Sequence, residues 1–117
     1  MPPPLVLVVE DDAVMRESCQ QTLERSGWRV VTAGDGFSAL KALRLRDPDL
    51  VVLDLKMPGM DGVDFLQHVR TDRPQLDVIV ITAYSSVGSA VECMRLGAYD
   101  YLPKPFDPDA LRLAVGR

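Results

Sequence analysis

Apolar runs alternate with amphipathic segments along the chain. Runs rich in Val, Leu and Ile are typical of strands buried on both faces, and an apolar period near 3.6 is typical of helices. The expected strands cover residues 5–9, 28–33, 50–54, 78–82 and 99–102. The expected helices cover residues 11–27, 36–46, 62–70 and 86–97, and a last helix begins after residue 107. The chain therefore repeats a strand–helix unit five times.

Glycine and polar residues mark the ends of several expected helices. Gly27 and Gly97 stand where two helical patterns stop, in the position that favours a left-handed backbone. Asp107 precedes Pro108, a pair typical of an N-cap and the first helical position. In segment 86–97 the apolar spacing predicts an inward face made of Val87, Ala90, Val91 and Met94.

Alternating strands and helices predict a parallel sheet covered by helices on both faces. A closed barrel of eight such units needs about 250 residues, so the 117 residues of this chain favour an open, doubly wound α/β sheet. We expect the strand order 2-1-3-4-5 and a single domain over residues 5–117, preceded by a disordered lead-in over residues 1–4.

Composition narrows the classes of function. The net charge is −4 without any run of Lys or Arg, so no direct contact with nucleic acid is expected. No apolar run approaches the ~20 residues of a membrane span, and residues 1–4 do not form a signal peptide. Cys19 and Cys93 lack the CxxC spacing and are expected to be reduced, which indicates a cytoplasmic protein.

Polar side chains gather at the carboxyl ends of the predicted strands, where ligands bind in doubly wound sheets. They are Glu10, Asp11 and Asp12 after the first strand, Asp54 in the third, Thr82 in the fourth and Lys104 after the fifth. In the order 2-1-3-4-5 the first and third strands are neighbours, which brings Glu10 and Asp11 beside Asp54. Clustered carboxylates repel one another, and an oxygen-only set suits Mg²⁺ or Mn²⁺.

Lys104 and Thr82 are expected on the other side of this cluster, where an ammonium and a hydroxyl group suit phosphoryl oxygens. A carboxylate nucleophile beside a hard metal and a cation predicts phosphoryl transfer onto Asp54. Asp12 is assigned to capping of the following helix or to charge support. His68, the only histidine, lies on the flank of an amphipathic helix and is expected at the surface.

Four segments, in order and suitably spaced, resemble one known family. "VVEDD", "LDLKMPGMDG", "ITAY" and "YLPKPF" are similar to the motifs of the response-regulator receiver domain of two-component signalling. The resemblance runs from Leu5 to about Val115 and implies a flavodoxin-like three-layer sandwich. The segments "KMPGMDG" and "TAYSSVGSAVECMRLGAYDYLPKPFD" are most similar to receivers of transcriptional activators that carry an ATPase domain and a DNA-binding domain.

The resemblance implies a role for each matching residue. Asp54 would be the phosphoacceptor, and Lys104 would pair with the phosphoryl group. Asp11 would bind Mg²⁺ directly together with Asp54, and Glu10 would act mainly through water. The backbone carbonyl of Lys56 would be a further metal ligand.

The resemblance also implies a switch and its partners. Thr82 would move toward the phosphoryl group and Tyr101 would rotate inward behind it. This motion would change the face made by the fourth helix, the fifth strand and the fifth helix, with Val91 and Arg95 as candidate members. That face would dock an output domain of the same protein or a second receiver copy. The Lys104–Pro105 peptide would be cis.

The family also implies a sensor histidine kinase as the phosphoryl donor and control of transcription as the output. A receiver catalyses only its own phosphorylation and dephosphorylation, so no enzyme activity on other substrates is expected. We expect the chain to be a fragment of a longer regulator, with a stand-alone receiver as the alternative.

Three other classes share parts of this pattern. A phosphatase of the haloacid-dehalogenase type needs an acid two residues after its nucleophile, where this chain has Lys56. A flavin-binding flavodoxin needs a phosphate loop after the first strand, where acids 10–12 would repel a phosphate. A receiver-like interaction module that is never phosphorylated is the remaining alternative, and the presence of every site residue argues against it.

Overall fold

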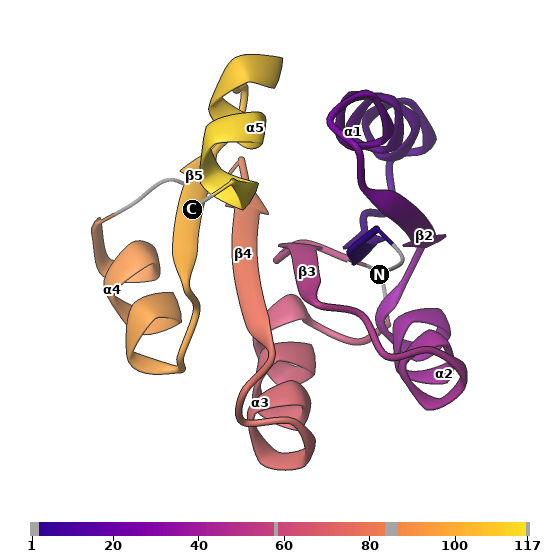
Figure 1. Ribbon diagram of the computed structural model, residues 1–117. Coiled ribbons are helices and arrows are strands. Elements are labelled where there is room, and N and C mark those ends of the chain that lie inside the picture. Colours follow the sequence, from indigo (N-terminus) through magenta and orange to yellow (C-terminus); the bar gives the residue numbers. More distant parts are fainter. Residues whose placement is uncertain (1–2, 58, 84–86, 117) are drawn as a thin grey trace.

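Five strands form one parallel sheet in the order β2-β1-β3-β4-β5, which confirms the predicted topology. The computed structural model describes residues 3–57, 59–83 and 87–116 (Figure 1). The strands are β1 (Leu5–Val9), β2 (Arg29–Ala33), β3 (Leu50–Asp54), β4 (Asp77–Thr82) and β5 (Asp100–Pro103). The helices are α1 (Ala13–Arg25), α2 (Gly36–Leu45), α3 (Gly62–Asp72), α4 (Val87–Arg95) and α5 (Pro108–Val115).

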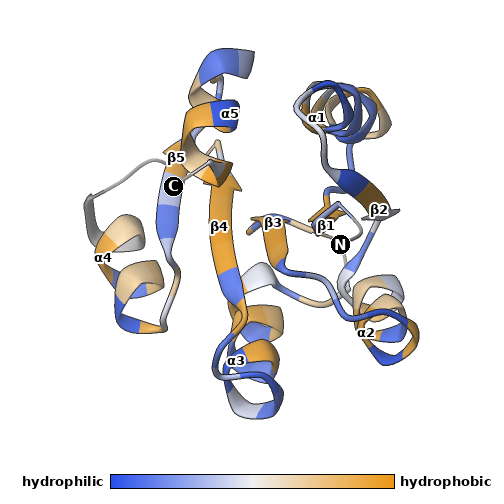
Figure 2. Ribbon diagram, in the orientation of Figure 1, coloured by the Kyte–Doolittle hydropathy of each residue, from blue (hydrophilic) through white to orange (hydrophobic). Residues whose placement is uncertain are grey.

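The helices cover both faces of the sheet (Figure 1). One core lies between the sheet and helices α1 and α5, and a second core lies between the sheet and helices α2, α3 and α4. Strands β1, β3 and β4 contribute alternate residues to the two cores, which is why their sequences are continuous apolar runs. Figure 2 shows β3 and β4 mainly hydrophobic between helices that carry both polar and apolar residues. Phe65 of α3 is fully buried, and Trp28 is partly buried.

Helix ends follow the local signals in the sequence. The side chains of four aspartates accept backbone N–H groups at helix N-termini, and these are Asp12, Asp35, Asp61 and Asp107. Gly27 and Gly97 have φ values of +94° and +96°, so each stands in the left-handed region that glycine tolerates best. Pro108 is at the start of α5, as predicted.

Helix α4 differs from the expected orientation. Val91 and Met94 are 50% and 48% exposed, whereas Cys93 is fully buried. The side chain of Val87 lies outside the described residues. Helix α4 packs beside β5 at the edge of the sheet, so it buries Cys93, partly covers Ala90 and leaves Val91 and Met94 exposed.

Residues 3 and 4 continue β1 toward the N-terminus beside the start of β2, and residues 1–2 of the expected lead-in lie outside the described residues. The carbonyl oxygens of Pro3 and Pro4 accept hydrogen bonds of 2.9 Å from the side chain and the backbone of Arg29.

Cys19 and Cys93 are free thiols, and each belongs to a different core, on opposite faces of the sheet. In the described parts of the chain no helix is long and apolar enough to cross a membrane.

Gly62 allows α3 to begin directly against the end of β3. Its N–H donates to the Leu55 carbonyl oxygen at 3.0 Å. A Cβ atom at this position would clash with the Cα atom of Leu55 and would lie 2.8 Å from the backbone oxygen of Asp54. Both neighbours are backbone atoms, which cannot move aside as a flexible side chain can.

We therefore expect Gly62→Ala to lower the free energy of unfolding by about 1–3 kcal/mol, the usual cost of overpacking. Urea unfolding of the two proteins measures this difference. Gly34→Ala is the matched control, because a Cβ atom there meets only the end of the Arg16 side chain. A loss no larger in Gly62→Ala than in Gly34→Ala would contradict this role of Gly62.

Candidate functional site

The register of the sheet brings four strand ends to one edge. Val9 pairs with Leu53, so the residues that follow β1 stand beside Asp54 at the end of β3. Asp54 pairs with Ile81 in β4. Thr82 and Pro103 pair at the ends of β4 and β5, which places Lys104 immediately beyond them.

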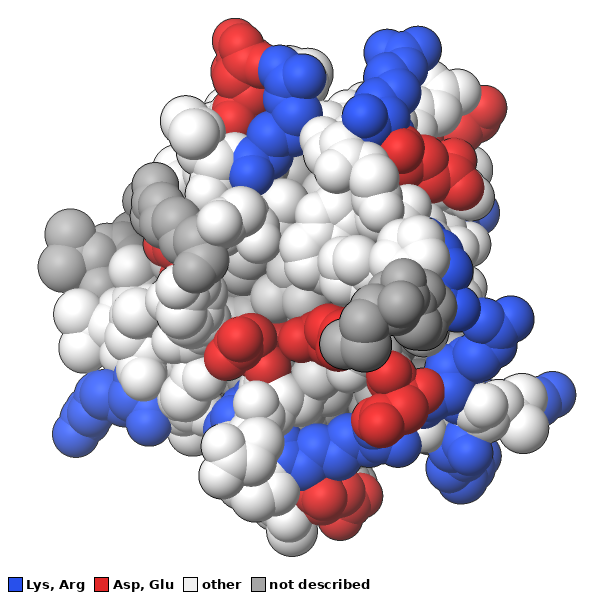
Figure 3. Space-filling view, viewed as in Figure 1, with Lys and Arg blue, Asp and Glu red and all other residues white. Residues whose placement is uncertain are grey.

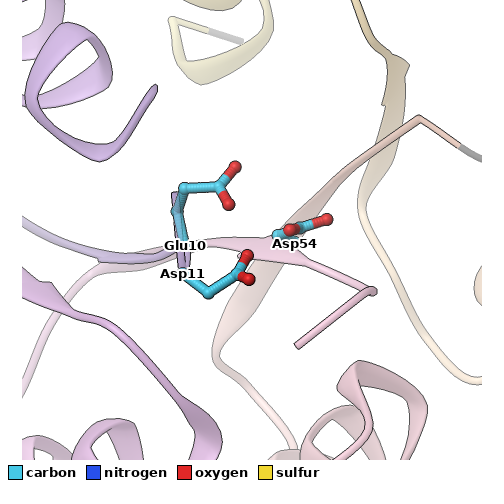
Figure 4. A group of neighbouring side chains, drawn as sticks. All are labelled: Glu10, Asp11 and Asp54. Atoms are coloured by element: carbon cyan, nitrogen blue, oxygen red, sulfur yellow. The ribbon is translucent and has the colours of Figure 1, made fainter. Parts of the chain in front are cut away.

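An acidic cluster occupies this edge. One carboxylate oxygen from each of Glu10, Asp11 and Asp54 lies within 4.8 Å of the others. Figure 4 shows the three side chains leaving two neighbouring strand ends. Glu10 is fully buried and Asp54 is 3% exposed, whereas Asp11 is open to solvent. Three carboxylates at this spacing form an oxygen-only set of donors, which fits Mg²⁺ or Mn²⁺.

Lys104 is the cation that faces the cluster. Its Nζ atom lies 2.5 Å from Oε1 of Glu10 and 3.5 Å from Oδ2 of Asp54. Its backbone N–H donates to the carbonyl oxygen of Thr82 at 2.8 Å, which fixes the start of the loop at the end of β4. The Lys104–Pro105 peptide is cis, as predicted. Lys104 was expected beside Asp54, and the structure adds the closer contact with Glu10.

Burial and pairing act differently on the two partners of this ion pair. Burial raises the pKa of Glu10 to about 7, although the Lys104 ammonium and the Asp12 N–H oppose the rise. Burial works to lower the pKa of Lys104, but the combined pairing with Glu10 and Asp54 outweighs it and raises that pKa. Burial dominates the pKa of Glu10 because this side chain is fully buried. Pairing dominates the pKa of Lys104 because its side chain is 16% exposed and faces two carboxylates.

The turn after β1 is held by hydrogen bonds around the acid pair. Oδ1 of Asp12 accepts the N–H groups of Val14 and Met15, which is the capping assigned to it from the sequence. The N–H of Asp12 donates to Oε2 of Glu10 at 3.1 Å. Arg16 donates to the carbonyl oxygens of Glu10 and Asp11. Sequence reasoning missed Arg16, and its only signal was a basic residue one helical turn after the acids.

The remaining predicted residues lie around this edge. Lys56 is exposed, and its N–H donates to Oδ1 of Asp54 at 3.2 Å. Thr82 is fully buried and Tyr101 is partly buried. His68 is exposed on α3, as predicted. The space-filling view shows acidic and basic side chains interspersed over the face that it presents (Figure 3).

Fold and site together define a doubly wound domain whose edge carries an acidic cluster paired with a lysine. The family model of the response regulator receiver domain matches residues 6–116, and the chain belongs to this family. The family resemblance inferred from the sequence is thus confirmed.

Known proteins similar to this chain include transcriptional regulators. The chain is 42% identical to the probable transcriptional regulatory protein TcrX of Mycobacterium tuberculosis, over 97% of the chain and 48% of TcrX. It is 41% identical to the DNA-binding transcriptional regulator NtrC of Escherichia coli, over 97% of the chain and 24% of NtrC. The chain thus spans about half of the length of TcrX and about a quarter of the length of NtrC.

Solved receiver structures share the fold. The receiver domain of NtrX from Brucella abortus superposes with a TM-score of 0.91 at 37% identity, over 96% of this chain and 95% of that one. Receiver domains of transcriptional regulators are signalling modules. The site at the carboxyl ends of the strands is therefore a candidate signalling site.

The raised pKa of Glu10 predicts a pH dependence of stability in metal-free protein. Below its ordinary pKa of 4.5, Glu10 is protonated in both the folded and the unfolded state. As the pH rises toward 7, the unfolded state ionises first, so this contribution to the free energy of unfolding is lost. We expect the wild type to lose up to about 3 kcal/mol more than Glu10→Gln between pH 4.5 and 7.

Urea unfolding in EDTA across this pH range measures the difference. Glu24→Gln, which changes an exposed acid of α1, is the control and should follow the wild type. Parallel curves for the wild type and Glu10→Gln would show that burial does not raise the pKa of Glu10.

Proposed function

We propose that this receiver is a phosphorylation-dependent switch in which Asp54 accepts a phosphoryl group from a sensor histidine kinase. The observation that carries the proposal is the position of Asp54. Its carboxylate is nearly buried at the end of β3, with an acid pair on one side and the Lys104 ammonium on the other. A buried, charged carboxylate destabilises the folded state unless an opposite charge or hydrogen bonds compensate it.

The chemistry requires only one bond exchange. A carboxylate oxygen of Asp54 attacks the phosphorus atom of the donor, a P–O bond forms, and the P–N bond to the kinase histidine breaks. The electron pair of that bond leaves with the imidazole nitrogen. Lys104, whose ammonium lies 3.5 Å from Asp54, would neutralise the charge on the phosphoryl oxygens, and the Thr82 hydroxyl would donate to the same oxygens.

The acidic cluster would hold Mg²⁺, or Mn²⁺ in its place. Asp11 and Asp54 would be direct ligands, together with the carbonyl of Lys56. Glu10 would act through water, because Lys104 and the Asp12 N–H already occupy its two oxygens. The bound ion would supply positive charge to the transferring phosphoryl group, which carries several negative oxygens.

The signal would leave through the face formed by α4, β5 and α5. Thr82 and Tyr101 would link this face to Asp54, because Tyr101 lies in β5 beside β4. Exposed apolar side chains in this region are Val91 and Met94 of α4, Tyr99 just before β5, and Leu113 of α5. They support a docking site here, for an output domain that controls transcription or for a second receiver copy.

Two observations support the proposal that this receiver is part of a longer, cytoplasmic regulator. The relatives TcrX and NtrC are longer than this chain, which supports its being the receiver part of a longer regulator. Two free thiols in separate cores support a reducing compartment, the cytoplasm. The alternative is a receiver-like module that docks partners without phosphorylation.

We expect Asp54→Asn to abolish uptake of acid-labile phosphate from acetyl phosphate and Mg²⁺, because the amide is not a nucleophile. Intact-mass measurement detects the gain of one phosphate. Asp64→Asn, at an exposed acid of α3, is the matched control and should be phosphorylated like the wild type. Wild-type phosphorylation of Asp54→Asn would refute the nucleophile, and no phosphorylation of the wild type would favour the interaction module.

A further inference from the structure

Arg16 lies behind the acidic cluster, on its backbone side. Its Nη1 atom lies 2.9 Å from the carbonyl oxygen of Glu10 and 3.4 Å from that of Asp11. Arg16 is the fourth residue of α1, and its backbone N–H donates to the Asp12 carbonyl oxygen at 2.8 Å. The side chain thus folds back across the turn from which the acid pair projects.

The partners of this guanidinium are peptide carbonyls. In residues 3–57, 59–83 and 87–116, Arg16 forms no ion pair with a carboxylate, although three carboxylates gather nearby. Arg16 is only half-buried, so solvent could have satisfied its charge. Its hydrogen bonds instead restrain the two peptide groups that orient Glu10 and Asp11.

A glycine leaves room for this arrangement. Gly34 follows β2, the neighbour of β1, and a Cβ atom at this position would lie 3.2 Å from Nη1 of Arg16. The end of β2 also fixes the backbone of Glu10, since the Glu10 N–H donates to the Ala33 carbonyl oxygen at 3.0 Å. The guanidinium therefore occupies a slot between the ends of β1 and β2.

We propose that Arg16 is a positioning residue for the metal and phosphoryl site, seated in the slot that Gly34 leaves open. It restrains the turn through the carbonyl groups of Glu10 and Asp11, so that the Asp11 carboxylate faces Asp54 before any ion binds. Without this restraint, ion binding would have to order the turn. This inference rests on the proposed function, since it concerns the same site.

The test is the affinity for Mn²⁺ alone, measured by titration calorimetry. We expect Arg16→Ala to raise the dissociation constant about tenfold, at the lower end of the range for groups that orient metal ligands. Arg16→Lys keeps the charge and should recover part of the loss. Arg25→Ala, at an exposed arginine at the other end of α1, is the matched control and should bind like the wild type.

Stability in EDTA separates positioning from a general structural role. Each variant is unfolded in urea without metal, and a purely structural Arg16 would change this stability and leave the Mn²⁺ affinity unchanged. If Arg16→Ala does not fold, Gly34→Ala decides, because its Cβ atom would lie 3.2 Å from Nη1 of Arg16 and would oblige the guanidinium to shift. Gly34→Ala should weaken Mn²⁺ binding in the wild type and, where Arg16→Ala folds, should add nothing in that background.

The outcomes distinguish this inference from the proposed function. Unchanged Mn²⁺ affinity in a folded Arg16→Ala or in Gly34→Ala, with normal binding and phosphorylation of the wild type, overturns the role of Arg16 alone. Equal losses from Gly34→Ala in the presence and absence of the Arg16 side chain also overturn it. A wild type that does not bind Mn²⁺ overturns the metal site and this inference together.

Discussion

The ion pair between Lys104 and Glu10 joins the two ends of the fold. Its partners are 94 positions apart in the sequence, and Glu10 is fully buried. A buried carboxylate is strongly destabilising without a partner, so the loop after β5 must bring the ammonium to the end of β1. The central position of β1 and β3 in the sheet and the Thr82–Lys104 backbone hydrogen bond both serve this placement. Asp54, the proposed phosphoacceptor, lies within reach of the same ammonium.

The crowding of acids at this edge connects stability with the proposed signalling. Three carboxylates face one lysine, so negative charge remains in excess until a cation or a phosphoryl–metal pair enters. We expect such a site to respond to ligands, because each added charge alters the electrostatic interaction between the Lys104 ammonium and the carboxylates. Exposed apolar side chains lie on α4 and α5, and Lys104 stands between β5 and α5, so the proposed output face includes elements next to this lysine.

Much of the fold follows from local signals in the sequence, and the exceptions have physical causes. Apolar runs predicted β1, β3 and β4 because these strands are buried on both faces. The strand order was chosen among the known doubly wound orders, because strand patterns alone do not fix it, and the structure confirms it. Val91 and Met94 were predicted wrongly to face inward from α4, because periodicity does not reveal that a helix at the sheet edge covers only a narrow stripe. The acids, Thr82 and Lys104 were expected at strand ends and lie there. Arg16 hydrogen-bonds to backbone carbonyls, for which the sequence offers only a basic residue one helical turn after the acids.

The central claim is that the crowded carboxylates form a metal site, and Asp11 tests it most directly. The free energy of unfolding is measured for the wild type and Asp11→Asn, each in EDTA and in millimolar Mg²⁺. Relief of repulsion should make Asp11→Asn more stable than the wild type in EDTA, by about 0.5–2 kcal/mol. Mg²⁺ should stabilise the wild type and have much less effect on the variant. A variant that is less stable in EDTA, or that gains as much from Mg²⁺ as the wild type, would contradict the claim.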